Sequence, residues 1–162
     1  FRKAAVNGGS HSLPLRLALQ GDERRNLVPV NWVSQVICHL LATPRSRGAT
    51  YHLASEVPIS ARLVLDAVYA YFRSEGLEFR GADWDNRSDL TSAEAAFRSH
   101  VKLYRDYELN DPTFDTTHLR RHVGHLPCPP IDKSVIHRYL RFGEHDRWGK
   151  KPVPHQLCRV AA

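Results

Sequence analysis

The chain has 162 residues, of which 42% are hydrophobic and 25% are charged, a composition ordinary for one globular domain. No apolar run approaches the roughly 20 residues that a membrane-spanning helix needs, and no charged-then-apolar leader opens the sequence. We therefore expect a soluble, cytoplasmic protein without a membrane partner. The sequence contains no methionine, even at position 1, so we also expect it to be a piece of a longer polypeptide.

The 23 Lys and Arg residues outnumber the 17 acidic residues and give a net charge of +6. They are spread in pairs, such as Arg24-Arg25 and Arg120-Arg121, which fits a solvated surface, a phosphate-bearing cofactor or carrier arm, or a nucleic acid. Nucleic acid is the least favoured, because the basic residues are not interleaved with aromatic residues. The scattered Cys38, Cys128 and Cys158 indicate reduced structural thiols rather than a disulfide framework.

Two strands and a helix are predicted for the first part of the chain. A short strand is predicted over 13–19 and a second, buried strand over 27–30, where Pro29 lacks an amide donor and so places the strand at a sheet edge. Asn31 is expected to cap the helix that follows, because its side-chain oxygen can accept a bond from an amide one turn later. The apolar residues of this helix recur at helical spacing: Val33, Val36, Ile37, Leu40 and Leu41.

The alternation of strands and helices continues beyond Pro44, which stops this helix. A strand is predicted over 49–54. Ser60 is expected to begin a strongly apolar helix that Gly76 ends, and a brief strand is predicted over 77–80. The pattern predicts an α/β fold, with a few short strands and about five helices in the whole chain.

Helices are predicted for the second half of the chain. Thr91 and Glu94 have the spacing of a capping box, and the helix that they open is expected to continue to about 107. A one- to two-turn helix is predicted over 118–122, and Asp132 is expected to cap the last helix.

Composition divides the chain into three parts. Residues 1–12 are polar and glycine-containing and are expected to be a flexible lead-in. Residues 13–142 contain the predicted strands and helices and form one α/β portion. Few residues are apolar from 143 onward, so 143–162 is expected to be a polar tail.

Several short segments carry a family resemblance. Val28-Pro29-Val30-Asn31-Trp32-Val33 is similar to a Val-Pro-Val-Asp-aromatic-Val junction of the extended short-chain dehydrogenase/reductases, which leads into their substrate-binding portion. Gly48-Ala49-Thr50-Tyr51-His52-Leu53 and Phe114-Asp115-Thr116-Thr117-His118-Leu119-Arg120 resemble later segments of thioester reductases and related acyl reductases. Asn31 departs from the usual Asp. The chain therefore resembles the carboxyl-terminal, substrate-binding portion of an extended Rossmann-type reductase.

The groups that move hydride and protons in that superfamily are missing here. A dinucleotide site needs closely spaced glycines at the start of a helix, and Asn7-Gly8-Gly9-Ser10 lacks that spacing. None of the six tyrosines has a lysine four residues later, so the Tyr-x-x-x-Lys pair is absent. We therefore expect no catalytic residue in this chain and no cofactor bound by the chain alone.

The spacing of His118, His122, His125 and Cys128 resembles that of metal ligands. Residues 118 and 122 share one helix face, as ligands of zinc often do. The predicted helix is short, no acidic base lies between the two histidines, and Arg120-Arg121 brings positive charge. We therefore favour solvated histidines at a helix end over a metal site.

The resemblance implies a function that needs a second part of the polypeptide. Such reductases take a carrier-bound acyl thioester and reduce it with NADPH, ending fatty-acyl, polyketide or nonribosomal peptide assembly. This chain would then form a lid over the acyl and phosphopantetheine groups, with an upstream nucleotide-binding domain that holds NADP and an acyl carrier protein as partners. The resemblance also implies that Val30, Asn31 and Trp32 line the substrate or cofactor. Core packing of Trp32 and capping by Asn31 are the alternative.

Two other functions remain open. The first is a non-catalytic interaction module inside a multidomain synthase or acyl-activating protein. The second is a stand-alone basic binding protein for an anionic partner, which the net charge of +6 allows.

Overall fold

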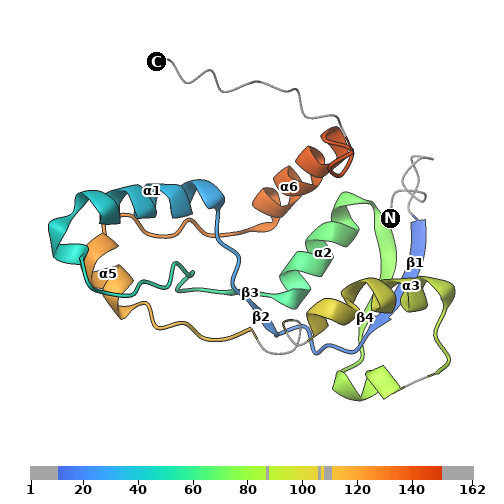
Figure 1. The fold of residues 1–162 in the computed structure, drawn as a ribbon. Helices are drawn as coiled ribbons and strands as arrows, with labels where there is room; N and C mark the ends of the chain where they lie inside the picture. The colour runs from blue at the N-terminus through green and yellow to red at the C-terminus, as the bar shows by residue number, and fades with distance from the viewer. Residues whose placement is uncertain (1–10, 87, 106, 108–110, 151–162) are drawn as a thin grey trace.

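The computed structural model of the chain describes residues 11–86, 88–105, 107 and 111–150, which form a mixed α/β fold (Figure 1). The longer elements are β1 (His11–Leu17), α1 (Val30–Ala42), α2 (Ala61–Tyr71), β4 (Ser74–Phe79), α3 (Ser92–Val101), α5 (Thr117–Val123) and α6 (Lys133–His145). The shorter ones are the strands β2 (Arg24–Arg25) and β3 (Ile59–Ser60) and the 3-10 helices η2 (Pro44–Ser46), η3 (Ala82–Asn86) and η4 (Lys102–Tyr104). The expected α/β class, with a few short strands and five α-helices in the described residues, is confirmed.

The strands form two separate pairs. β1 and β4 run parallel, with Leu15 opposite Leu77 and Leu17 opposite Phe79. Their register shifts just before Leu15, where Pro14 has no amide hydrogen to donate. Parallel strands need a long crossover connection, and α1 and α2 lie in this one. β2 and β3 form a short antiparallel pair.

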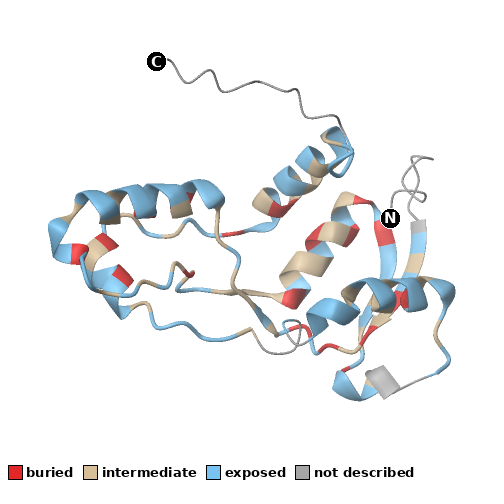
Figure 2. Cartoon of the chain, in the orientation of Figure 1, coloured by how far each residue is buried: buried red, intermediate tan, exposed pale blue. Residues whose placement is uncertain are grey.

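Three groups of buried apolar side chains hold the elements together. The first contains Leu15 and Leu17 of β1 and Tyr69 of α2, with Phe97 of α3 packed against it. The second joins α1 to α5, and the third joins α2 to α6. Figure 1 shows the α1–α5 pair as a lobe at one end of the molecule, connected to the rest by extended segments. Figure 2 shows buried positions where the helices meet.

The predicted strand over 27–30 is wrong, because this segment is the entrance to α1. Pro29 is the N-cap residue in an extended conformation, and its carbonyl accepts a bond from the first turn of the helix. A proline suits the start of a helix, since the first amides have no intrahelical partner. Leu27 and Val30 are exposed rather than buried, and Asn31 lies inside the helix instead of at its cap. A short apolar run does not distinguish a strand from a helix start.

The predicted strand over 49–54 is wrong as well, since the structure gives this segment no strand partner among the described residues. The polar contacts of this segment are made through side chains rather than through backbone bonds to a neighbouring strand. The Nδ1 atom of His118 lies 3.1 Å from the Thr50 carbonyl oxygen, and the Tyr51 hydroxyl donates to the Ser46 carbonyl at 2.9 Å. Leu53 packs against the core that joins α1 to α5. The apolar alternation in this segment therefore reflects packing on a helix.

Several element ends differ from the predicted ones. β1 begins at His11, two residues inside the predicted lead-in, and α6 continues to His145, beyond the predicted end of the folded part. Gly76 does not end α2, which stops at Tyr71, but lies within β4. α3 ends at Val101, where η4 follows. Residues 1–10 and 151–162, which hold most of the predicted lead-in and part of the predicted tail, lie outside the described residues.

Three of the four predicted helix caps are confirmed, and only the cap predicted at Asn31 is wrong. The Ser60 hydroxyl and the Asp132 carboxylate each accept a bond from the first turn of α2 and α6, respectively. Thr91 and Glu94 form the full capping box, in which each side chain accepts a bond from the backbone amide of the other.

Within the described residues, no helix combines the length and the apolarity that crossing a bilayer requires.

Candidate functional site

A cavity of about 420 Å³ opens between the end of β1, η3 and α3. Its volume lies in the range of roughly 300–1,000 Å³ that is usual for pockets holding small ligands. Leu15 and Leu17 of β1 and Leu19 beyond it are buried residues in the wall of this cavity. The remaining lining residues are Arg16, Ala18, Ala82, Trp84, Leu90, Glu94, Phe97, Arg98, Val101, Lys102 and Arg105.

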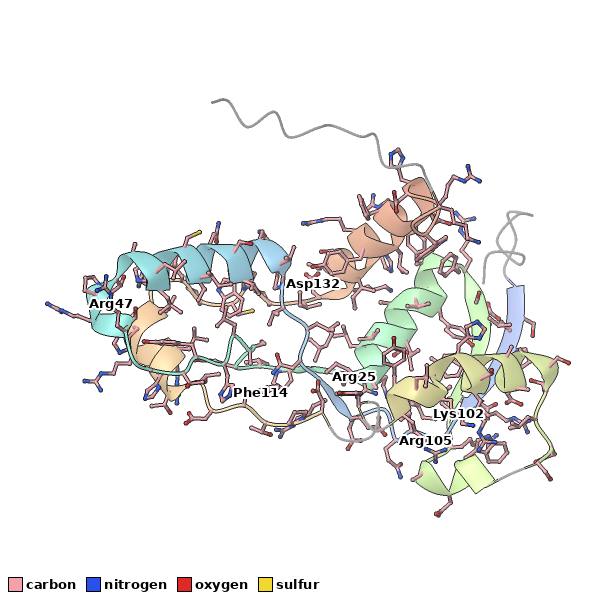
Figure 3. All side chains as sticks on the ribbon, viewed as in Figure 1. Arg25, Arg47, Lys102, Arg105, Phe114 and Asp132 are labelled. Carbon is pink, nitrogen blue, oxygen red and sulfur yellow. The ribbon has the colours of Figure 1, made fainter. Side chains whose placement is uncertain are left out.

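The helical segment α3–η4 presents two neighbouring stripes of side chains to the cavity. Glu94, Phe97 and Val101 recur at helical spacing and form the first stripe. The second stripe consists of Arg98, Lys102 and Arg105. Figure 3 shows Lys102 and Arg105 close together at the carboxyl-terminal end of α3. An apolar interior beside a row of cations suits a ligand with an apolar chain and an anionic end.

Arg16 and Glu94 fasten α3 to β1 in the wall of the cavity. The Nε and Nη2 atoms of Arg16 donate to the two carboxylate oxygens at 2.6 and 2.8 Å, and the Arg16 amide donates at 3.0 Å. These bonds, with one from the Thr91 amide, hold the pKa of Glu94 well below its usual range, and the carboxylate raises the pKa of Arg16. The guanidinium also lies 4.7 Å from the centroid of the Trp84 ring, a cation–π distance. Glu94 therefore stays ionised at neutral pH.

The lining of the cavity consists mainly of apolar and cationic side chains. Among the described residues that form it, none is a His, Cys, Ser, Thr or Tyr. Its one carboxylate, Glu94, is held ionised by Arg16 and so has no proton to donate at neutral pH. Apolar contact and charge attraction are the interactions that these side chains can offer a ligand.

The three residues predicted to line a ligand lie in the α1–α5 lobe and line neither this cavity nor the smaller one near β2. Val30 is 79% exposed, and Asn31 is exposed as well. Trp32 is 3% exposed, and its indole Nε1 donates to the Leu126 carbonyl at 2.9 Å. The structure thus uses Trp32 as a core residue, as the alternative interpretation expected. Contact of these three residues with a ligand stays a prediction.

A second cavity, of about 350 Å³, lies near β2 and is mostly polar. The Asp111 carboxylate accepts a bond from the Asn26 amide, and the Asn26 side-chain oxygen accepts one from the Ser55 amide at 3.0 Å. Arg120 lies 3.7 Å from a carboxylate oxygen of Glu56. Positive and negative side chains are mixed in this lining, so its charge does not favour the binding of an anion.

The three histidines with metal-ligand spacing make separate aromatic contacts. Tyr51 has its ring centroid 6.1 Å from that of His118 and 5.9 Å from that of His122. His125 instead packs against His39 of α1, with 4.5 Å between the ring centroids. In the described part of the chain, no three His, Cys, Asp or Glu side chains are grouped as a metal ion would need. The spacing along α5 therefore serves the packing of the α1–α5 lobe.

Sequence reasoning missed the residues that build the larger cavity. Glu94 was predicted only as a cap, and its partner Arg16 is 78 positions away, a separation that no local pattern reveals. The second stripe could have been recognised in the sequence. Arg98, Lys102 and Arg105 recur at intervals of four and three residues and therefore share one helix face.

No family model matches the chain. The chain is 27% identical over 143 residues to the nonribosomal peptide synthetase FrzA of Cladobotryum sp., in a match that covers 76% of this chain and 14% of that protein. It is 28% identical over 144 residues to the aldehyde reductase lnaA of Aspergillus flavus, covering 75% of this chain and 14% of that protein. The chain therefore spans a small share of the length of both relatives.

A solved structure shares the fold. The terminal R domain from the myxalamid PKS-NRPS biosynthetic pathway matches with a TM-score of 0.57 and 23% sequence identity, covering 85% of this chain and 37% of that chain. The chain thus has the fold of a portion of that R domain. The two sequence relatives are named as a nonribosomal peptide synthetase and an aldehyde reductase.

Proposed function

We propose that this chain is the substrate-binding portion of an NADPH-dependent reductase that acts on carrier-bound acyl thioesters. A nucleotide-binding portion of the same polypeptide holds NADP, and an acyl carrier protein presents the substrate on its phosphopantetheine arm. The 162-residue chain covers the acyl group as a lid and is not catalytic by itself. In this role it belongs to a cytoplasmic polyketide or nonribosomal peptide assembly system.

The cavity beneath α3 is the observation that carries the proposal. Leu17 and Phe97 offer an acyl chain an apolar surface, which favours its removal from water. Lys102 and Arg105 at the edge of the cavity attract the phosphate-bearing arm as it enters from solvent. Among the described residues of the lining none is a tyrosine, so we assign the reducing chemistry to another part of the polypeptide. The named activity of the relative lnaA, an aldehyde reductase, supports the same assignment.

The test is NADPH oxidation by the complete polypeptide that contains this chain, with acyl phosphopantetheine thioesters of increasing chain length as substrates. We expect NADPH to be consumed only when an acyl thioester is present. Binding of a carrier protein without NADPH oxidation would instead indicate an interaction module. Binding of many unrelated polyanions without NADPH oxidation would indicate a basic binding protein.

A matched pair of variants tests whether the cavity holds the acyl chain. Val101→Phe adds bulk inside the cavity, whereas Leu103→Phe adds an aromatic ring at a side chain that is 87% exposed. For a long acyl thioester we expect Val101→Phe to raise KM about tenfold, because the pocket can no longer accept the end of the chain. Leu103→Phe should leave KM unchanged. Equal KM values for the two variants would show that the acyl chain does not bind in this cavity.

A further inference from the structure

Helix α1 is unusual because its 13 residues include no Asp, Glu, Lys or Arg. Its inner face packs against α5 through Trp32 and Val36, which are 3% and 0% exposed. A helix with one face in water normally carries charged residues on that face. The exposed residues of α1 are uncharged, since polar Asn31, Ser34 and Gln35 share the surface with apolar side chains.

The outer face of α1 carries a second set of apolar side chains, which we call the α1 stripe: Val30, Ile37 and Leu41. These residues recur at intervals of seven and four positions and therefore lie along one side of the helix, where the exposed Ser34 lies between Val30 and Ile37. They are 79%, 45% and 77% exposed. Figure 2 shows this helix as exposed over most of its length. Exposing these apolar side chains to water is unfavourable, so we expect a partner to cover the α1 stripe.

We infer that the α1 stripe is the docking surface for the nucleotide-binding portion of the same polypeptide, an inference that rests on the proposed function. The terminal R domain that shares this fold extends well beyond the matched segment, which is 37% of that chain. A reductase built in the same way has a second, larger part that must contact this one. The α1 stripe gives that part an apolar surface on a helix already anchored by α5.

The absence of charge on α1 favours a permanent partner. Interfaces that never open are depleted of charged residues at their centre, whereas transient partners are commonly steered together by charge. An anionic carrier arm would be drawn to Lys102 and Arg105 at the cavity and not to α1. A part of the same polypeptide stays attached and keeps the α1 stripe out of water.

The thiol of Cys38 reports whether the α1 stripe is covered, because Cys38 is exposed and adjoins Ile37. The reference is a thiol introduced by Ser99→Cys at an exposed position of α3. In the complete polypeptide, we expect iodoacetamide to alkylate Cys38 about tenfold more slowly than the reference thiol. Leu41→Glu should restore fast alkylation of Cys38, because a charge is costly to bury at the contact. Gln35→Glu adds the same charge to α1 outside the α1 stripe and should leave Cys38 protected.

Three results would overturn the inference, and they are distinguishable. Fast alkylation of Cys38 in a polypeptide that reduces acyl thioesters would refute the docking surface and leave the proposed function standing. Protection that disappears on dilution, together with a doubled mass in light scattering, would show that a second copy covers the α1 stripe. Protection in a polypeptide that does not bind NADPH would refute both the nucleotide-binding partner and the proposed function.

Discussion

Arg16 on β1 and Glu94 on α3 form an ion pair through two parallel N–H···O bonds, although 78 positions separate them in the sequence. The carboxylate is 3% exposed and the guanidinium is 25% exposed. The same carboxylate caps α3 by accepting a bond from the Thr91 amide. One buried charge therefore fixes both the start of α3 and its position against β1, and with them the wall of the larger cavity.

Glu94→Gln should destabilise the fold strongly, because it removes the charge and leaves Arg16 facing a neutral group. We expect the free energy of unfolding to fall by about 2–3 kcal/mol, measured by urea unfolding with tryptophan fluorescence. Glu78→Gln is the control, because Glu78 pairs with Arg80 at the surface and both side chains are 49% exposed. That change should cost less than about 0.5 kcal/mol. Equal losses would show that the buried pair contributes no more than the surface pair.

The same carboxylate should make the stability depend on pH in the acid range. The hydrogen bonds from Arg16 hold the pKa of Glu94 below its ordinary value of 4.5. Between the two pKa values the unfolded chain binds a proton that the folded chain does not, so acid favours unfolding. The contribution of Glu94 is therefore complete above pH 4.5 and is lost as the pH falls toward the folded pKa.

The measurement compares the original chain with Glu94→Gln in urea unfolding from neutral pH down to about pH 3. The difference in unfolding free energy between the two proteins should shrink with decreasing pH, since only the original chain has this carboxylate to protonate. A difference that stays constant over this range would mean that Glu94 has an ordinary pKa in the folded protein.

The starts of α2, α3 and α6 were predictable because their capping hydrogen bonds join residues that are close in sequence. Ser60 and the pair Thr91 and Glu94 bind amides within the next turn, so residue type and spacing were sufficient. The entrance of α1 was not predictable in this way. The apolar run that ends at Val30 fits a buried strand and a helix start equally well, and only the packing of α1 on α5 decides between them.

The larger cavity could not be predicted, since it depends on contacts between distant segments. Arg16 was merely a polar position in a predicted strand, and nothing local connects it to Glu94. The resemblance pointed instead to Val30, Asn31 and Trp32, which lie in the α1–α5 lobe. A family motif can fix the order of elements in the chain, but the pocket depends on how those elements pack.

Gly76 should tolerate no side chain, because the parallel strands approach closely at this residue. Its φ angle is +100°, and a Cβ atom there would lie 2.9 Å from the Cα atom of Pro14. We expect Gly76→Ala to lower the free energy of unfolding by about 2 kcal/mol or more. Gly48→Ala is the control, since Gly48 has a φ of +79° but no atom within 4 Å of the added Cβ. It should cost about 1 kcal/mol, from backbone conformation alone. Equal losses in thermal unfolding would show that the contact with Pro14 is unimportant.

Trp32→Phe separates a structural role of this residue from a role in ligand binding. The change keeps an aromatic ring in the α1–α5 core but removes the indole N–H that bonds to the Leu126 carbonyl at 2.9 Å. We expect a loss of about 1–2 kcal/mol in urea unfolding, because the partly buried carbonyl loses its donor. Trp148→Phe, at a side chain that is 47% exposed, should cost less than about 0.5 kcal/mol. In the complete polypeptide, KM for an acyl thioester should not change with Trp32→Phe, since the ring lines neither cavity. A raised KM with unchanged stability would show that the indole contacts the ligand, as the family resemblance implied.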